Sequence, residues 1–141
     1  MNELTLPNIP TREQIVSLEN AMRELSAVEI VPVHHFANGL YAREITIPAG
    51  TLLTGKVHKT EHLNIVSKGC ITVWTEHGMK MVSAPFTMVS QPGTKRVGYA
   101  HEDTVWTTIH ATAETDLERL EAELIEPELL TREDLPCLGL E

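Results

Sequence analysis

Cysteines, aromatic residues and long apolar runs are all scarce in this sequence of 141 residues. The longest apolar runs fall far short of the roughly 20 residues that a membrane-spanning helix needs, so no transmembrane helix is predicted. Two cysteines, Cys70 and Cys137, are too few for a disulfide framework or a zinc site. Because 42% of the residues are hydrophobic and only 4% are aromatic, we expect a core built mainly from Val, Ile, Leu and Met.

Basic residues are also few, with 11 Lys and Arg against 20 Asp and Glu, which gives a formal net charge of −9. This balance argues against a nucleic-acid-binding surface. The carboxylates gather after residue 113, and the middle of the chain is close to neutral, so a small anionic ligand remains acceptable in a local pocket. The N-terminal segment lacks the basic and apolar regions of a secretory signal, so a cytoplasmic protein is expected.

Amphipathic helices are predicted at both ends of the chain. A capping box at 11–14 precedes apolar residues at helical spacing and predicts a helix over residues 12–26. A second capping box at 115–118 predicts a helix over 116–126, which Pro127 ends. We therefore expect an N-terminal arm and helix over 1–27 and an acidic C-terminal helix and tail over 113–141.

Residues 28–112 have a different pattern, in which short apolar or alternating runs are separated by turn residues such as Lys68-Gly69 and Pro92-Gly93. Many short strands with regular turns indicate an antiparallel sandwich or barrel. The chain is thus predicted to form one mainly β domain. Its predicted strands are 28–33, 40–47, 51–57, 62–67, 70–75, 80–83, 87–90, 96–100 and 104–110.

The segment from Gly50 to Gly69 resembles the first motif of the cupin superfamily, which reads Gly, five residues, His-x-His, three or four residues, Glu, six residues, Gly. Gly50 matches the opening glycine, and Lys56 stands in the place of the first histidine. His58 matches the second histidine, and His62 falls on the glutamate position, six residues before Gly69. One motif ligand is therefore matched, and a second is replaced by another imidazole.

The second cupin motif is similar to the segment around Gly93, which matches its central glycine. Arg96 stands where the third histidine belongs, and Ala100 replaces the asparagine. The resemblance covers roughly residues 41–110 and extends to the small single-domain cupins of phage genomes. It implies a single antiparallel jelly-roll β-barrel flanked by the N-terminal and C-terminal helices. It also implies a homodimer.

The histidine pair suggests a divalent transition metal. Alternate residues of a strand share a face, so Lys56 and His58 are expected to point the same way. A turn at 59–60 then brings His62 onto the same wall, and a shift of that turn by one residue would turn Glu61 inward instead. Two imidazoles need further ligands or water to complete a stable site. Other imidazoles are available at His34, His35, His101 and His110.

Cationic side chains give the same pocket a second interpretation. Lys56 and Arg96 occupy motif positions, and Arg43 lines the same wall if Tyr41 faces inward. Two unit charges about 4 Å apart repel by about 4 kcal/mol at an effective dielectric near 20, so these cations weaken a metal site. Arginine forks and lysine ammonium groups bind carboxylate and phosphate well. Lys56, His58, His62, Arg96, Arg43 and Tyr41 are therefore the predicted ligand-binding residues.

Four functions remain open at this point. The first is a small-molecule-binding cupin with a degenerate metal site and a cationic pocket for a small anionic or polar ligand. The second is a metal-dependent enzyme, such as a dioxygenase, isomerase or lyase, with the metal on His58 and His62 and with Glu61, another histidine or water as a further ligand. The third is a metal-free acid–base enzyme. The fourth is a structural or assembly dimer.

Overall fold

The computed structural model describes residues 7–22 and 28–126, which form two helices and nine strands. Neither described helix is long and apolar enough to cross a membrane. In chain order the elements are α1 (Arg12–Met22), β1 (Val33–Ala37), β2 (Leu40–Ile47), β3 (Leu52–Thr54), β4 (His62–Lys68), β5 (Cys70–Thr75), β6 (Gly78–Ser83), β7 (Phe86–Ser90), β8 (Val97–Ala100), β9 (Thr104–Ala111) and α2 (Leu117–Leu124).

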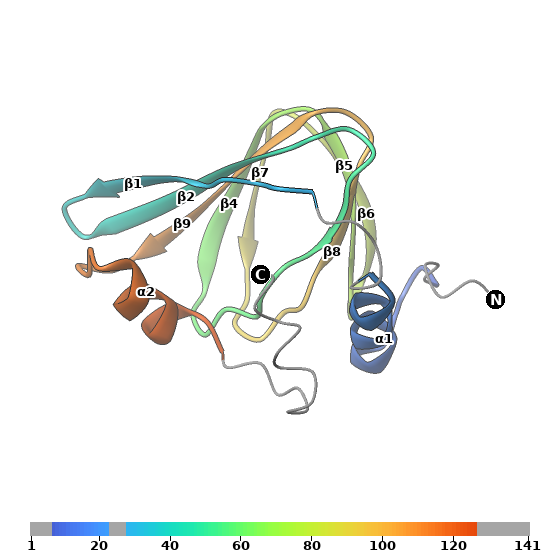
Figure 1. Cartoon of the computed structure of the whole chain (residues 1–141), viewed down its shortest axis with the longest axis horizontal. Helices are drawn as coiled ribbons and strands as arrows, with labels where there is room; N and C mark the ends of the chain where they lie inside the picture. Colours follow the sequence, from blue (N-terminus) through green and yellow to red (C-terminus); the bar gives the residue numbers. More distant parts are fainter. Residues whose placement is uncertain (1–6, 23–27, 127–141) are drawn as a thin grey trace.

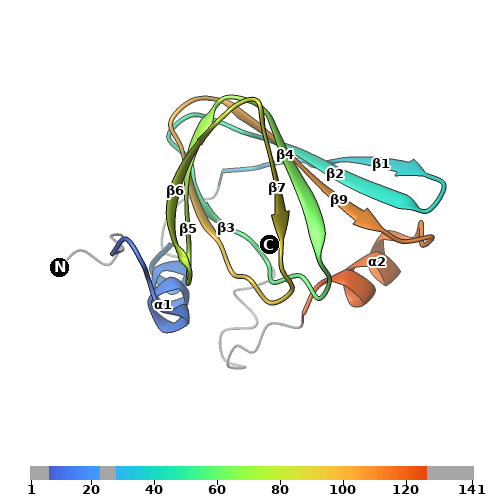
Figure 2. The ribbon, with the colours of Figure 1, turned by 180° about the vertical axis from the view of Figure 1, so that it is seen from behind.

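The strands form two antiparallel sheets that face each other (Figure 1). Sheet A has the order β1-β2-β9-β4-β7, and sheet B has the order β3-β8-β5-β6. The connections β2–β3, β4–β5, β6–β7 and β8–β9 meet at one end, and the sheets splay apart at the other (Figure 2). The predicted mainly β fold with antiparallel sheets is confirmed, but the two sheets do not close into the predicted barrel. Among the described residues no hydrogen-bonded ladder joins the two sheets, and β1, β7, β3 and β6 are their edge strands.

The space between the sheets holds an aliphatic core with one large aromatic residue, Trp106. Buried residues of this core are Ile47, Val66, Ile71, Val73, Val82, Ala100 and Trp106. The expectation of a core low in aromatic residues is confirmed for the described part of the chain. This core fills the narrow end of the sandwich.

Helix α1 packs on sheet B and starts as predicted. The backbone N–H of Gln14 donates to Thr11 Oγ1 at 3.1 Å, and the Thr11 N–H donates to Gln14 Oε1 at 2.8 Å. Ile15 and Leu18 are buried against the sheet. A nearly buried ion pair joins Lys95 Nζ to Glu19 Oε2 at 2.7 Å. The predicted helix ran to residue 26, and residues 23–27 lie outside the described part.

Helix α2 covers the open end beside sheet A, where Leu120 and Leu124 pack on Tyr41. Its N-cap is Asp116, whose carboxylate accepts a hydrogen bond from the Arg119 N–H at 3.1 Å. The predicted cap, Thr115, is wrong by one residue. Aspartate caps a helix at least as well as threonine, so the helix begins one residue later.

Strand β1 differs most from its prediction. The apolar run 28–33 was predicted as a strand, whereas β1 begins at Val33 and ends at Ala37. The reason is a tight hairpin in which Phe36 lies opposite Tyr41 and Gly39 takes a φ of 78°. Pairing with β2 therefore determines where β1 begins and ends, and the apolar character of residues 28–32 does not. Strand β3 is also shorter than predicted and ends at Thr54.

Candidate metal and ligand site

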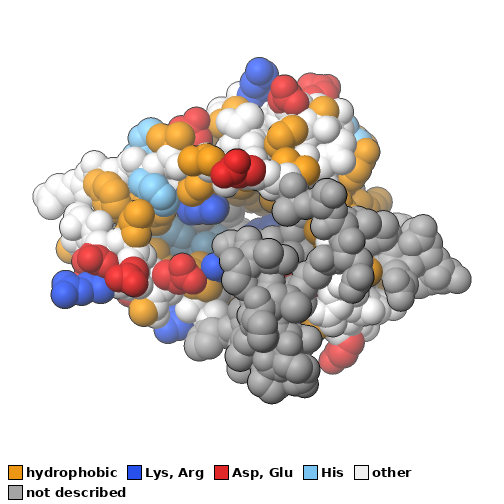
Figure 3. All heavy atoms as spheres, viewed as in Figure 1, with side chains coloured by type: hydrophobic (Ala, Val, Ile, Leu, Met, Phe, Trp, Pro, Cys, Tyr) orange, Lys and Arg blue, Asp and Glu red, His pale blue; other side chains and the backbone are white. Residues whose placement is uncertain are grey.

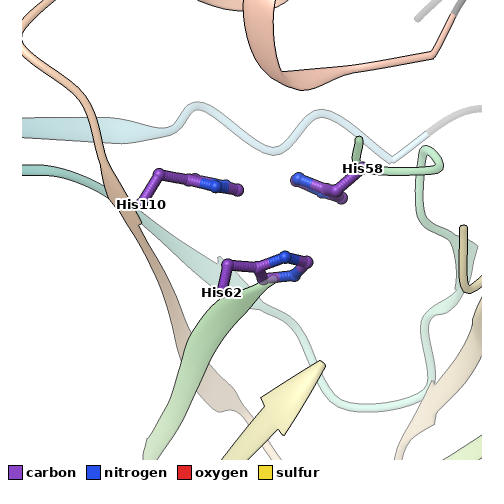
Figure 4. A group of neighbouring side chains, drawn as sticks. All are labelled: His58, His62 and His110. Carbon is purple, nitrogen blue, oxygen red and sulfur yellow. The ribbon is translucent and has the colours of Figure 1, made fainter. Parts of the chain in front are cut away.

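Three imidazoles converge at the open end of the sandwich (Figure 4). His62 begins β4, His110 lies near the end of β9, and His58 belongs to the loop between β3 and β4. Ring centroids are 4.4 Å apart for His58 and His62, 4.9 Å for His58 and His110, and 4.7 Å for His62 and His110. One nitrogen atom from each ring lies within 4.8 Å of the other two.

Sheet pairing brings two of these histidines together. Strands β4 and β9 run antiparallel, with Asn64 opposite Thr108. His62 is two residues before Asn64 and His110 is two residues after Thr108, so both imidazoles face inward at the same level. His110 was noted in the sequence as a further imidazole and left unassigned. Only the pairing of β4 with β9 reveals it as the third member of the cluster.

Backbone hydrogen bonds from two directions hold the loop that carries His58. The Gly93 N–H donates to the His58 carbonyl at 3.0 Å. The Lys59 N–H donates to the Leu124 carbonyl at 2.7 Å, and His58 forms an isolated bridge with Ile125. The loop is therefore fixed between the segment before β8 and the C-terminal end of α2, and the His58 ring points at the other two imidazoles.

Lys56 does not share this direction. The strand alternation that would align it with His58 is absent, because β3 ends at Thr54. Its Nζ lies 3.2 Å from Glu121 Oε2 of α2. The structure thus places the Lys56 ammonium group beside α2, and the expectation that Lys56 binds the ligand stays a prediction.

Glu61 also lies outside the cluster. Its side chain is exposed, and its carboxylate accepts a hydrogen bond from Gln91 Nε2 at 3.0 Å. His62 takes the inward direction at the start of β4 and is 6% exposed. Neighbouring strand residues point to opposite faces, so Glu61 does not share the direction of His62, and its role as a metal ligand stays a prediction.

Burial keeps all three imidazoles neutral at physiological pH. Desolvation, followed by the neighbouring His62, His110 and Arg96, lowers the pKa of His58 to about 3. Desolvation and then His62 lower the pKa of His110 to about 4. The pKa of His62 is also lowered, mainly by desolvation. Neutral imidazoles are the form that binds metals.

The hydrogen bonds of the cluster leave lone pairs available. His62 Nδ1–H donates to the Thr60 carbonyl at 2.9 Å, which leaves Nε2 as the unprotonated nitrogen. A backbone carbonyl on the second nitrogen is the usual support of a metal-binding histidine. The Nδ1 atoms of His58 and His110 are buried and have no hydrogen-bond partner among residues 7–22 and 28–126. An unsatisfied buried polar atom costs about 1–3 kcal/mol, so a ligand that used these nitrogens would relieve a real penalty.

This donor set fits a divalent transition metal. Imidazole nitrogens suit Zn²⁺, Fe²⁺, Ni²⁺ and Cu²⁺. Two nitrogens bound to one tetrahedral ion at about 2.0–2.1 Å lie about 3.3 Å apart. The three nitrogen atoms lie within 4.8 Å of one another, which is wider than that spacing, so the rings would have to move closer to hold an ion.

A buried polar layer lies next to the imidazoles. Arg96 donates from Nη2 to Ser90 Oγ, which also accepts a hydrogen bond from Asn64 Nδ2 at 2.6 Å. Asn64 Oδ1 accepts from Trp106 Nε1 at 3.0 Å and from Thr108 Oγ1 at 3.3 Å. Within residues 7–22 and 28–126, no carboxylate forms an ion pair with Arg96. Its charge therefore acts on the imidazoles, and it contributes to the lowered pKa values of His58 and His62.

Tyr41 and Arg43 adjoin the cluster from β2. Tyr41 is buried, its ring is stacked 6.4 Å from the His110 ring, and its hydroxyl is hydrogen-bonded to His34 Nδ1 at 2.7 Å. Burial raises the pKa of this hydroxyl. Arg43 lies on the same face of β2 and is exposed, yet its charge reaches His58. Figure 3 shows imidazoles and a cationic side chain recessed in a hollow at this end.

Comparisons with known proteins identify the fold. No protein-family model matches the chain, and no curated protein matches it by sequence. Among solved structures, KdgF from a Halomonas species matches with a TM-score of 0.53 and 17% identity over 66% of this chain and 90% of that one. A cupin-2 domain protein from Shewanella frigidimarina matches with a TM-score of 0.50 and 15% identity over 66% and 91%.

A third match is an RmlC-like cupin from Methanocaldococcus jannaschii with a double-stranded β-helix fold, at a TM-score of 0.50 and 13% identity over 62% and 84%. At these identities the likeness shows the fold alone. The fold is that of cupin-domain proteins, as the motif resemblance implied. The resemblance to phage proteins and the cytoplasmic location stay predictions.

Proposed function

We propose that this chain is a small-molecule-binding cupin in which His58, His62 and His110 hold a divalent transition metal. Beside the metal, Arg96 receives a small anionic ligand. The main support is the convergence of three neutral imidazoles, two of which have a buried Nδ1 without a hydrogen-bond partner in the described part of the chain. His110 lies outside both motifs and supplies a third imidazole, which compensates for a histidine that the motifs lack.

Arg96 supports the anionic character of the ligand. Its guanidinium has five N–H donors, and one hydrogen bond, to Ser90 Oγ, is present among the described residues. Burial lowers the pKa of Arg96, which shows how poorly solvent compensates its charge. A carboxylate or phosphate oxygen would satisfy the remaining donors and offset the repulsion between Arg96 and a dication. Arg43 at the rim adds attraction for an approaching anion.

A bound metal would act as a Lewis acid toward an oxygen of the ligand. The residues of this chain have separate tasks around it. Asn64 and Ser90 hold Arg96 in place, and Thr60 fixes the tautomer of His62. Helix α2 limits the access of water from the side of Tyr41.

Metal analysis of the purified chain tests this proposal. We expect close to one transition metal per chain after equilibration with Zn²⁺ or Co²⁺. His110→Gln should weaken metal binding at least about 100-fold, because loss of a supporting partner alone costs 10–100-fold. His77→Gln is the matched control, since His77 is exposed in the turn between β5 and β6. Equal metal content in wild type and His110→Gln would refute the metal site.

Ligand binding is tested separately on the Co²⁺-loaded protein with malonate and inorganic phosphate as probes. The visible Co²⁺ spectrum reports an oxygen ligand that enters the coordination sphere. We expect a spectral change that saturates in wild type and weakens by about tenfold or more in Arg96→Gln, as loss of a charged hydrogen bond requires. An identical titration in Arg96→Gln would show that Arg96 does not receive the anion.

Catalysis by the same centre is the second candidate. One observation favours it: three protein ligands leave at least one coordination position open, as catalytic zinc sites do and closed structural sites do not. A dioxygenase, isomerase or lyase reaction would then depend on all three histidines. Turnover that survives in the His58→Gln, His62→Gln and His110→Gln variants would eliminate this candidate.

A further inference from the structure

The connection between β7 and β8, residues 91–96, passes between helix α1 and the imidazole cluster. Within it, the Gly93 N–H donates to the His58 carbonyl at 3.0 Å. The Gly93 carbonyl accepts a hydrogen bond at 2.7 Å from Nη2 of Arg12, the first residue of α1. One glycine therefore joins α1 to the loop that carries His58.

An ion pair holds the same connection against α1. Lys95 Nζ lies 2.7 Å from Glu19 Oε2 of the helix, and the two side chains are 5% and 11% exposed. Val97, two residues after Lys95, is fully buried in the cluster that α1 forms on sheet B. Arg96 lies between these two residues and points the other way, toward Ser90. Helix α1 and the connection therefore form one packed unit, from which Arg96 reaches into the site.

The Arg12 guanidinium also has a second partner. Its Nη2 lies 3.0 Å from Glu76 Oε1, in the turn between β5 and β6, and its Nε donates to the same oxygen at 3.3 Å. The rigid fork of an arginine makes the carboxylate contact and the contact with the Gly93 carbonyl together. The guanidinium is thus fixed on sheet B, and it holds Gly93 from there.

The position of His58 decides whether the three imidazoles can hold one ion. His62 and His110 lie on β4 and β9, which a hydrogen-bonded ladder holds together. His58 lies on a loop, so its ring reaches the other two only while backbone hydrogen bonds hold that loop. Helix α2 holds one side, where its end accepts a hydrogen bond from the Lys59 N–H at 2.7 Å. Gly93 holds the other side, and Figure 1 shows the two helices on opposite sides of the open end.

We propose that Arg12 is a positioning residue for His58, acting through Gly93, and that helix α1 thereby sets the geometry of the metal centre. The inference rests on the proposed function, because it concerns the three-histidine site. It adds a residue that touches neither the metal nor the anion. Without the Arg12 hydrogen bond, the His58 loop is held less firmly. The ring nitrogens, which lie up to 4.8 Å apart, then come less readily to the closer spacing that one ion requires.

Competition with a chelating dye measures the Zn²⁺ affinity of the full chain. Arg12→Gln should weaken Zn²⁺ binding about tenfold, at the lower end of the loss of about 10–100-fold that follows removal of a supporting partner. Glu76→Gln is the matched control, because it removes the ion pair of Arg12 and leaves the hydrogen bond from Arg12 to Gly93 in place. It should change the affinity by less than about twofold. At saturating Co²⁺, only Arg12→Gln should alter the visible spectrum, which reports coordination geometry and is insensitive to overall stability.

Amide hydrogen exchange of the metal-free protein gives a second measurement. In Arg12→Gln the Gly93 N–H should exchange about tenfold faster than in wild type, as loss of a charged hydrogen bond at the same residue implies. The amides of the β4–β9 ladder report global stability. The increase at Gly93 should exceed any increase in that ladder.

The outcomes separate this inference from the proposed function. Tight Zn²⁺ binding by wild type, with an equal affinity in Arg12→Gln, would overturn the inference and leave the proposed function standing. Unchanged Gly93 exchange in Arg12→Gln would also overturn it. Equal weakening in Arg12→Gln and Glu76→Gln would refute it, because the ion pair and not the bond to Gly93 would then matter. A wild type that binds no Zn²⁺ would refute the proposed function, and the role of Arg12 would fall with it.

Discussion

Acid should destabilise the metal-free protein through its buried imidazoles. An unfolded histidine binds a proton below pH 6.5, whereas the pKa of His58 is lowered to about 3 and that of His110 to about 4 in the folded state. Between pH 6.5 and pH 4 the unfolded chain therefore binds more protons than the folded chain. Folding stability must fall as the pH decreases through this window, and it is unaffected by these groups above about pH 7.

The magnitude follows from the two pKa values. At pH 5 each histidine is about 1.5 pH units below its unfolded pKa, and one unit corresponds to 1.36 kcal/mol, so each contributes a loss of about 2 kcal/mol. Water at the open end screens part of this effect, which reduces the expected loss for the pair to about 2–3 kcal/mol. Such a loss is a large fraction of the 5–15 kcal/mol that stabilises a typical domain.

Urea unfolding with EDTA at pH 7.5, 6 and 5 measures this loss. His110→Gln removes one titrating group, so its stability should fall by about 1 kcal/mol less than that of wild type over the same interval. His77→Gln should match wild type. Added Zn²⁺ should raise the stability of wild type at pH 7.5, because a metal that binds only the folded state stabilises it. The reasoning is refuted if His110→Gln and wild type lose equal stability between pH 7.5 and pH 5.

Three further predictions concern single residues. Gly69→Ala should destabilise the fold by several kcal/mol, because φ is 95° and a Cβ would lie 2.3 Å from the Asp103 carbonyl oxygen. Gly50→Ala, with open space around a Cβ and a φ of 84°, should destabilise it by only about 1–2 kcal/mol. Equal losses of stability for the two variants in thermal unfolding would contradict this prediction. Glu19→Gln should destabilise by about 3 kcal/mol, since it leaves Lys95 buried and unpaired, and an unchanged melting temperature would count against that reading. Arg96→Gln should bind Zn²⁺ about tenfold more tightly than wild type in anion-free buffer, as competition with a chelating dye measures, and an equal or weaker affinity would show that Arg96 does not oppose the metal.

Some elements could be read directly from the sequence. Strands β2 and β5 were predicted with their observed bounds, because alternation and turn residues mark both ends. The Thr11 capping box also formed as predicted. β1 and the short β3 could not be predicted in this way. Hairpin pairing defines the first of these strands, and the contacts of the following loop with α2 shorten the second.

Some residues of the candidate site could likewise be predicted from the sequence, and others could not. His58, His62 and Arg96 are visible in the spacing of the motifs, because a local pattern carries them. His110 lies 48 residues after His62, and only the β4–β9 register aligns the two. The position of Lys56 beside Glu121 likewise depends on a helix that lies far away in the sequence.

The sequence by itself determined a mainly β chain with a helix on each side, a histidine pair and an arginine in place of a ligand. These features follow from local periodicity, turn chemistry and spacing, which act within a few residues. The tertiary structure alone decided which side chains share the open end, that the sheets splay instead of closing, and that His110 completes the cluster. Those outcomes depend on contacts between segments far apart in the chain, and no local pattern encodes them.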